Sequence, residues 1–318
     1  MQKLIIEPTP HIRSDNSTSQ IMFHVIIATV PAILASIAIF GARAAIMIFV
    51  CVCSCVFFEF FFRLIFKKSR TIGDYSAVVT GIILAFNLPV TLPLYMAVIG
   101  CFAAIVVVKE MFGGLGQNFV NPAIVGRIVL MLSFPSHMSS YVKAFYYLEC
   151  DIEATTAATP LAVESPELMP SMLELFLGTH GGSLGETSAL ALLIGFVYLL
   201  AMRIIRPVTP LVFIGTVAIG TLIATGGDFE AVLFTILTGG LLLGAIFMAT
   251  DYTTNPMTLR GKFVFAFGCG LISFIIRQFG GMPEGVAFSI LTMNMLTPFI
   301  DKITRPKPFG AVEFKNNE

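Results

Sequence analysis

Tryptophan is absent from this sequence of 318 residues, and charged side chains are scarce. Asp, Glu, Lys and Arg make up 12% of the chain, which is about half their share in an average soluble domain. A soluble fold of this length would therefore lack the polar side chains that its surface needs. With 56% hydrophobic residues and a mean hydropathy of +0.89, the composition indicates a polytopic membrane protein. Because Trp is missing, Tyr and Phe must supply the aromatic residues at the membrane interfaces.

Two further absences exclude classes of partner and of metal site. The formal net charge is zero, so nothing in it indicates binding to nucleic acid or to an acidic partner. The six cysteines include no C-x-x-C pair, and no histidine lies near them at metal-ligand spacing. Cys51, Cys53 and Cys55 would point to different faces of a helix. We interpret the cysteines as small apolar residues, and we predict no metal site and no catalytic residue in this chain.

Apolar runs that can span a bilayer, about 20 residues each, recur along the chain. Ten ranges qualify: 21–40, 44–62, 74–90, 92–110, 118–134, 188–203, 208–226, 229–249, 262–279 and 284–301. We therefore predict an all-α polytopic membrane protein with about ten transmembrane helices. The third and fifth ranges are short and carry Gly, Asn and Pro, which predicts broken helices buried in protein or lining a cavity. Spans that are merely tilted or short are the alternative.

A short pattern recurs in the two halves of the chain. Gly100-Cys101, followed by Phe112–Gly114, returns as Gly268-Cys269, followed by Phe279–Gly281. Because each half would hold five spans, the halves would lie in opposite orientations, as in the inverted repeats of many transport proteins. Chance similarity between two glycine-rich apolar segments is the alternative.

Five segments follow from these patterns. They are an N-terminal segment (1–20), a first membrane repeat (21–134), a long loop (135–187), a second membrane repeat (188–301) and a C-terminal tail (302–318). Lys and Arg in the short loops and the tail favour the cytoplasmic side, so both termini are predicted to be cytoplasmic. The long loop carries one lysine, Lys143, against seven acidic residues, and is predicted to be extracytoplasmic.

Charged side chains inside a membrane are candidates for function. They are Glu59, Lys109, Glu110, Arg127, Asp251 and Arg277. Most lie at predicted span ends, where we interpret them as side chains that reach the interface. Arg127 lies deepest. One interpretation is structural, as an interhelical salt bridge or a carbonyl clamp; the other is that Arg127 pairs with an anionic group of a ligand. For His24, alone in the first span, packing or an interhelical hydrogen bond is expected.

The long loop contains a polar turn of small residues between positions 151 and 162. Pro160 favours an extended conformation at Thr159, and the small side chains of Ala157 and Ala158 leave the Thr159 hydroxyl accessible. Such a hydroxyl can be esterified, although the chemistry alone does not single it out.

The stretch Thr156–Thr159 resembles the flavin-attachment motif of the membrane subunits of Rnf and sodium-pumping quinone reductase complexes. The family pattern has an acidic residue, Ser or Thr, a small residue, Ala, and a final Thr that carries FMN through a phosphoester. Here Ala157 replaces the usual Gly or Ser, and Glu153 replaces the usual Asp. Residues 113–127 and 247–256 resemble the same family. The similarity covers essentially the whole chain, and its length suits the D subunit of Rnf complexes.

The resemblance implies a covalent FMN on the outer face and a noncovalent riboflavin within the spans. Asn-Pro and Thr-Asp segments at the ends of predicted spans could bind a flavin or a cation, because broken helix ends present unpaired amides and carbonyls. The expected cofactor-binding residues are Thr159, which would carry the FMN, with Thr156, Ala158, Pro160, Asn121, Arg127, Thr250 and Asp251.

By the same resemblance, the chain is a non-autonomous subunit, in a bacterial inner membrane, of a complex that couples ferredoxin oxidation and NAD reduction to movement of Na⁺ or H⁺. Its partners would be the lipid bilayer, the other membrane and peripheral subunits, including a second FMN-bearing subunit, and the flavin transferase that matures it. A solute channel or transporter of similar inverted-repeat architecture and a purely structural membrane anchor are the alternative functions.

Overall fold

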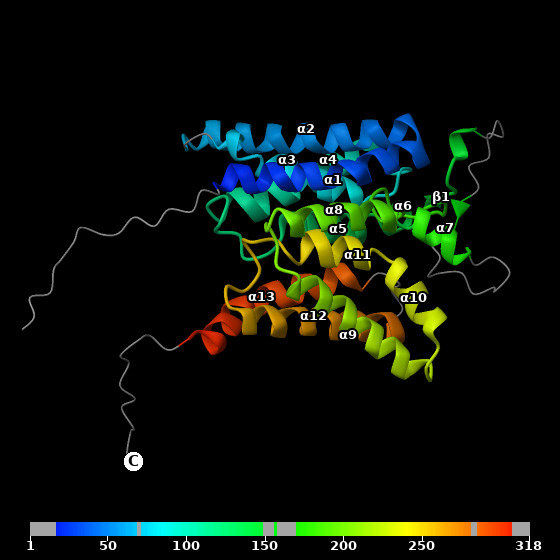
Figure 1. Cartoon of the computed structure of the whole chain (residues 1–318). Coiled ribbons are helices and arrows are strands. Elements are labelled where there is room, and N and C mark those ends of the chain that lie inside the picture. Colours follow the sequence, from blue (N-terminus) through cyan, green and yellow to red (C-terminus); the bar gives the residue numbers. More distant parts are fainter. Residues whose placement is uncertain (1–16, 69–70, 149–155, 158–169, 281–284, 307–318) are drawn as a thin grey trace, which may run out of the picture.

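The computed structural model describes residues 17–68, 71–148, 156–157, 170–280 and 285–306, and these are mostly helical (Figure 1). The α-helices are α1 (Thr18–Phe40), α2 (Ala42–Ile65), α3 (Ser76–Phe86), α4 (Leu94–Phe102), α5 (Pro122–Ser133), α6 (Pro135–Met138), α7 (Met172–Leu177), α8 (Ala189–Ala201), α9 (Val208–Ala224), α10 (Phe229–Leu237), α11 (Leu241–Leu243), α12 (Leu259–Phe279) and α13 (Val286–Thr304). Two π-helical segments, η2 (Ala103–Glu110) and η6 (Gly244–Met248), continue α4 and α11.

Short elements occupy the connections between these helices. They are the 3₁₀ turns η1 (Ile72–Asp74) and η3 (Tyr146–Leu148) and the strands β1 (Tyr141–Val142) and β2 (Thr156–Ala157). The two strands pair antiparallel, with Tyr141 opposite Ala157. This pair fixes the start of the motif 156–159 against the remainder of the long loop.

Every one of the ten predicted spans coincides with a helical segment. Among the described residues, α1, α2, α12 and α13 are long and apolar enough to cross a membrane, and α10 with α11–η6, bent by 64°, is a fifth such segment if the two parts count as one span. The helices α3 and α5 have only 11 and 12 residues. At 1.5 Å per residue each covers about 18 Å or less, against a hydrocarbon core of about 30 Å. The structure thus establishes a multi-pass helical protein, and the count of ten spans stays a prediction.

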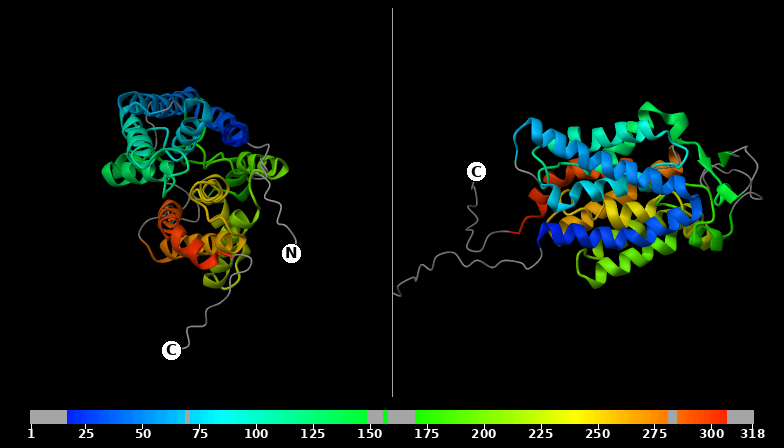
Figure 2. Two further views of the ribbon diagram at one scale, coloured as in Figure 1. Left: turned by 90° about the vertical axis from the view of Figure 1, so that its left-hand side faces the viewer. Right: turned by 90° about the horizontal axis from the view of Figure 1, so that it is seen from above.

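The helices lie roughly parallel and form two halves (Figures 1 and 2). In the first half α2 packs against α3 and α4, and in the second half α12 packs against α9 and α13. Contacts of α1 with α8 and of α5 with α13 join the halves. The start of α1 and the end of α13 lie at one end of the bundle, and β1 and α7 lie at the other (Figure 1). This arrangement agrees with termini on one side and the long loop on the opposite side.

The α1–α8 contact contains the one histidine of the first span. His24 Nδ1 lies 2.9 Å from the Tyr198 hydroxyl, so the two side chains share a hydrogen bond between helices. The interhelical hydrogen bond expected for His24 is confirmed. A polar ring on an apolar helix thereby keeps a partner inside the protein.

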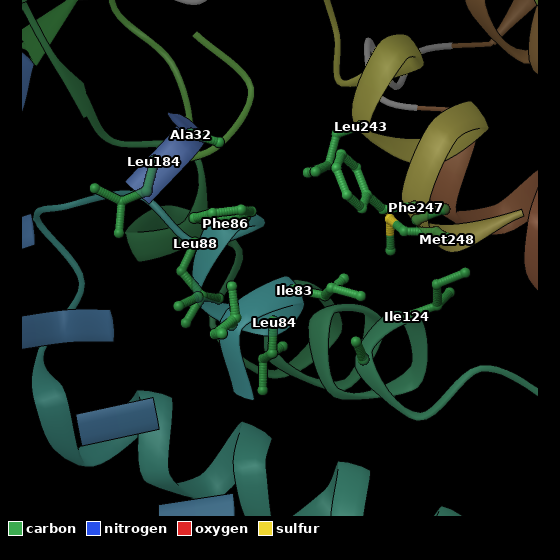
Figure 3. Packing of buried hydrophobic residues seen from close by; sticks show 14 of the residues in the cluster. Ala32, Ile83, Leu84, Phe86, Leu88, Ile124, Leu184, Leu243, Phe247 and Met248 are labelled. Atoms are coloured by element: carbon green, nitrogen blue, oxygen red, sulfur yellow. The ribbon is translucent and has the colours of Figure 1, made fainter. Parts of the chain in front are cut away.

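Where the two halves meet, apolar side chains from both pack together (Figure 3). Ile83 and Phe86 of α3 belong to the first half, and Leu243, Phe247 and Met248 of α11–η6 belong to the second; all five are buried. The short third span is therefore buried in protein along its length. A helix too short to cross the hydrocarbon core needs this burial, because its open backbone groups cannot face lipid.

The end of α3 is satisfied by a distant part of the chain. Leu184 N–H donates to the Leu88 carbonyl at 3.1 Å, and Gly185 N–H donates to the Phe86 carbonyl at 2.9 Å. These bonds pair backbone groups that the short helix leaves open. They favour the interpretation of α3 as a broken helix held in protein over that of a merely tilted span.

Gly81 lies where α3 crosses α2. A Cβ atom at this position would lie 2.8 Å from the Val52 Cα atom and 3.0 Å from the Cys51 carbonyl oxygen. Both contacts are to backbone, which no side-chain rotation relieves. Gly215, in the middle of α9, offers a matched comparison because no heavy atom lies within 4 Å of its Cβ position.

We expect Gly81→Ala to lower the free energy of unfolding by about 1–3 kcal/mol, the usual cost of overpacking. Gly215→Ala should leave it unchanged or raise it by up to ~1 kcal/mol, because alanine is the better helix former. Thermal unfolding of the detergent-purified protein measures both effects. Equal midpoints for the two variants would show that the α2–α3 crossing is not tight.

Candidate functional site

The stretch 113–127 turns the chain from η2 into α5. Gly113 and Gly114 have φ angles of +121° and +97°, and a Cβ atom at Gly114 would lie 2.5 Å from the Arg63 guanidinium. Both glycines are thus required by the turn, and the second also by the close approach of Arg63. Asn121 then caps α5: its side-chain oxygen accepts from Ala123 N–H at 3.0 Å. The Asn-Pro pair of this stretch is a helix start.

The stretch 247–256 forms the end of the broken span and the turn that follows it. Phe247 and Met248 close η6, and Asp251 then accepts from the backbone N–H and the hydroxyl of Thr253, at 3.2 and 3.1 Å. Burial raises the pKa of the Asp251 carboxyl above its usual range, and the two hydrogen bonds from Thr253 oppose that rise. The turn is therefore held by an acidic side chain in a poorly solvated place.

The two stretches touch each other across the boundary between the halves. Asn121 Nδ2 donates to the Met248 carbonyl at 3.4 Å, so the cap of α5 also satisfies a carbonyl near the end of η6. Segments that lie more than a hundred positions apart in the sequence thus share one hydrogen bond. Both stretches were singled out from the sequence, and the structure brings them to the same place.

A cavity of about 70 Å³ lies at this meeting point. Its apolar walls come from both halves and include Met22, Ile83 and Phe247. Asn118 contributes a buried side-chain oxygen that has no hydrogen-bond donor. An unpaired buried acceptor costs about 1–3 kcal/mol, so its position beside a cavity indicates a ligand or water that donates to it.

The predicted cofactor-binding residues separate into four groups, of which Arg127 alone is the last. Asn121, Thr250 and Asp251 line this cavity together. Thr156 lies in β2, at the opposite end of the bundle from the start of α1 (Figure 1). The other three motif residues, Ala158, Thr159 and Pro160, lie outside the described residues.

Arg127 is not part of the cavity wall. It is 5% exposed, and its Nη1 donates to Asn87 Oδ1 at 2.6 Å, just beyond the end of α3. Gly240, at the bend between α10 and α11, lies close to the Arg127 guanidinium and the Glu186 carboxylate. Arg127 thus links α5 to the end of α3 through the Asn87 side chain, and its role toward an anionic ligand group stays a prediction.

The bend at Thr238–Gly240 is held by a second arginine. Arg277 of α12 donates to the carbonyls of Thr235, Thr238 and Gly239 at 2.8, 3.0 and 2.8 Å. These are the carbonyl groups that the end of α10 exposes. A cation at the end of a helix also interacts favourably with the helix dipole. Arg277 thus stabilises the broken span as a carbonyl clamp.

Lys109 and Glu59 form a buried ion pair beside the cavity. Lys109 Nζ donates to Glu59 Oε2 at 2.8 Å and to the Ser76 hydroxyl at 2.6 Å, and Lys109 lines the cavity wall. Each of the two charged side chains is 1% exposed. The interpretation of these charges as side chains that reach the interface is therefore wrong.

The same interpretation fails for Glu110. It is 0% exposed, and Arg63 donates to its carboxylate through Nε and Nη2, at 3.1 and 3.0 Å. Thr71 donates to Glu59 at 2.7 Å and completes this buried network. Two acids and two bases balance one another, which is the condition under which buried charges are tolerated.

Sequence reasoning missed the roles of Asn118 and Ser76. Asn118 belongs to the recognised stretch 113–127, so an amide shortly before the helix cap was the available signal. Ser76 gave no signal, because its role depends on Lys109, 33 positions away along the chain. In the part of the chain that the structure describes, no three His, Cys, Asp or Glu side chains gather at metal-binding distance.

We expect Lys109→Met to destabilise the protein by about 3–5 kcal/mol, because it leaves Glu59 buried without its cation. Lys67→Met, at an exposed lysine, should change stability little. Adding Glu59→Gln to Lys109→Met should recover part of the loss. Thermal unfolding in detergent measures all three variants. A double variant as unstable as the sum of its single changes would contradict the pairing.

The chain is similar to known proteins over nearly its whole length. A model of the NQR2, RnfD, RnfE family matches residues 5–310. The D subunit of the Na(+)-translocating ferredoxin:NAD(+) oxidoreductase complex of Acetobacterium woodii is 45% identical over 98% of this chain and 97% of its own length. The D subunit of the proton-translocating ferredoxin:NAD(+) oxidoreductase complex of Clostridium ljungdahlii is 42% identical over 96% of each.

A more distant relative shows the same extent of similarity. The D subunit of the ion-translocating oxidoreductase complex of Stutzerimonas stutzeri is 36% identical over 93% of both chains. Identity at this level along nearly the full length covers both halves, the long loop and both stretches around the cavity. The chain belongs to the NQR2, RnfD, RnfE family.

Proposed function

We propose that this chain is the flavin-bearing membrane subunit of an ion-motive complex that couples electron transfer between ferredoxin and NAD to movement of Na⁺ or H⁺. The observation that carries the proposal is the meeting of 113–127 and 247–256 around one cavity with an unpaired amide oxygen. The three relatives are named as D subunits of ion-translocating oxidoreductase complexes, which supports the same role.

Ten spans in two inverted sets of five are the topology that we propose. Support comes from the helices, since each predicted span coincides with one, and from the placement of the start of α1 and the end of α13 at one end of the bundle. We place both termini in the cytoplasm and the loop 135–187 outside, on the basis of the basic short loops. The membrane is then the bacterial inner membrane.

The cavity between the halves is the proposed site of a noncovalent riboflavin. Asn118 Oδ1 would accept from an N–H or hydroxyl of the ligand, and Met22, Ile83 and Phe247 would exclude water from it. A volume of about 70 Å³ is smaller than the ~300–1,000 Å³ of typical ligand pockets. Side chains in the wall must therefore move apart when the ligand enters. A bound flavin supplies the redox chemistry, and these residues supply its placement.

Thr159 is the proposed attachment point of a covalent FMN. Support comes from the strand pair, in which the motif's first two residues, Thr156–Ala157, lie against β1 at the end of the bundle that holds the long loop. A second FMN-bearing subunit and a flavin transferase are the partners that this attachment requires. The chain works only within the complex, where its neighbours deliver and remove electrons.

The proposal leaves the transported ion to the complex. The Acetobacterium relative is named as Na⁺-translocating and the Clostridium relative as proton-translocating, yet their identities to this chain differ by only 3 percentage points, 45% against 42%. The same scaffold thus serves complexes named for two ions. The choice of ion therefore rests on a small number of residues or on other subunits.

We expect Thr159→Ala to abolish covalent flavin, because no other hydroxyl takes the final position of the motif. The whole complex is purified, separated on a denaturing gel and examined for flavin fluorescence, and peptide 150–175 is checked by mass spectrometry. Thr155→Ala, at a position that the motif leaves free, is the matched control and should keep the fluorescent band. Fluorescence that persists in Thr159→Ala would overturn the attachment.

We expect Asn118→Leu to weaken noncovalent flavin binding about tenfold, since it removes one buried hydrogen bond to the ligand. The flavin released from the purified complex by acid denaturation is quantified by chromatography. Asn294→Leu removes another buried asparagine without donors to its oxygen, in α13 and away from the cavity, and should leave the released flavin unchanged. Equal flavin release from both variants would place the riboflavin elsewhere while leaving the Thr159 test intact.

A further inference from the structure

A second cavity, of about 210 Å³, lies beside the first. It is bordered by the connection from α8 to α9, by the turn after η6 and by the first turn of α12. Both cavities share Ile204, Ile205, Thr250 and Tyr252 in their walls, and the first also contacts Ile21 near the start of α1. The second cavity therefore lies at the end of the bundle where α1 begins, which the basic loops predict to be cytoplasmic.

Three cationic side chains line this cavity. Arg203 and Arg206 come from the α8–α9 connection, and Lys262 comes from α12. Arg206 and Lys262 lie close enough for their charges to repel each other. Within the described residues, none of the three forms an ion pair. Like charges gathered at a cavity without counterions indicate a site for an anion.

The acidic side chains on the neighbouring segments do not neutralise these cations. Asp301 Oδ1 accepts from the backbone N–H of Met257 at 3.0 Å. Asp251 accepts from Thr253 and lines the first cavity instead of the second. Neither carboxylate forms an ion pair with the three cations. As far as the described part of the chain goes, the cations are therefore open to a ligand.

The start of α9 adds to the positive potential. This helix of 17 residues follows Pro207 and has no side-chain cap, so its first N–H groups have no side-chain acceptor. Thr209, in its first turn, lines the cavity. An uncapped helix N-terminus attracts anions, and phosphate groups most of all.

The cavity also contains a neutral side chain, Asn255, whose oxygen needs a hydrogen-bond donor. Asn255 Nδ2 donates to the Thr209 hydroxyl at 3.4 Å, whereas the buried Asn255 Oδ1 has no hydrogen-bond partner. A ligand that satisfies the whole site therefore carries an anion for the cations and a hydrogen-bond donor, such as a hydroxyl, for this oxygen. A phosphate ester of glycerol has both.

We propose that this cavity binds the phosphate ester of an anionic glycerophospholipid headgroup, with Arg203, Arg206 and Lys262 around the phosphate and Asn255 Oδ1 accepting from a headgroup hydroxyl. The place fits a lipid, because α9 and α12 continue from the cavity as apolar helices. Phosphatidylglycerol has the required combination of groups. None of the three cations lines the flavin cavity, and bound lipid would seal the wall that the two cavities share.

The test uses the whole purified complex in nanodiscs of phosphatidylcholine with a minor fraction of phosphatidylglycerol. Native mass spectrometry counts the phosphatidylglycerol molecules that remain bound after release from the nanodisc. We expect Arg206→Gln combined with Lys262→Gln to lower this retention about 30-fold. Each cation near the membrane surface adds a similar amount to the free energy of binding an anionic lipid, and the variant loses two of them. Lys302→Gln combined with Arg305→Gln, two exposed cations at the end of α13, should retain the lipid as the wild type does.

Equal retention in both double variants would overturn the site. Excess glycerol 3-phosphate, added to the wild-type complex, separates the two possible sources of the phosphate. If it displaces the lipid completely at low concentration, the cavity serves a soluble phosphate ester and the lipid assignment is wrong. Size-exclusion profiles confirm that the variant complexes assemble. If the complex with Arg206→Gln and Lys262→Gln does not assemble, Arg203→Gln, at an exposed arginine, is tested in its place.

Asn255→Ala tests the headgroup contact separately from the charges. Wild-type complex should prefer phosphatidylglycerol to phosphatidic acid, which lacks the glycerol hydroxyls, by about tenfold. The variant should bind both lipids alike. A variant that keeps the full preference would show that Asn255 does not contact the headgroup.

Discussion

A polar group buried in an apolar bundle must find its partner within the protein, and this constraint accounts for the irregular elements of the fold. The end of α3 is paired by backbone groups of Leu184 and Gly185. The bend after α10 is closed by Arg277, and the start of α5 by Asn121. Each of these interruptions is thus matched by a group that satisfies the open helix end. At the start of α5 the capping residue, Asn121, also bonds across the two halves through the Met248 carbonyl.

The same constraint explains why the first cavity lies where it does. The buried pair of Lys109 and Glu59 and the cap at Asn121 converge on the boundary between the halves, because that is where broken helices leave backbone groups to satisfy. One acceptor in this region, Asn118 Oδ1, has no donor. An unpaired buried oxygen in the wall of a cavity is best explained by a ligand or water that donates to it. The geometry therefore points to binding by an argument that does not use the family resemblance.

Much of the fold could be predicted from the sequence, because hydropathy acts over a window of neighbouring residues. Each of the ten apolar ranges became helical, and the glycines and the Asn-Pro pair of 113–127 became a turn and a cap. The bend at Thr238–Gly240 was not predicted, because Arg277 stabilises it from 39 positions away. The burial of Glu59 and Lys109 was missed for the same reason. Local sequence located these charges at helix ends, and only tertiary packing decides whether such an end reaches water.

The two cavities and the strand pair lie at different positions along the axis of the helix bundle. The first cavity contacts the start of α1, and the second shares its wall. The strand β1, which pairs with β2, lies at the opposite end of the bundle (Figure 1). If the covalent and noncovalent flavins occupy their proposed places, one chain carries redox groups near both faces of the membrane. Electron transfer between them would then move charge across the bilayer, past the buried pair of Lys109 and Glu59. Lys109, which lines the first cavity, and Glu59 already neutralise each other, so this pair leaves a moving cation free to respond to the electron. This argument explains how relatives named for Na⁺ and for protons can share the same fold.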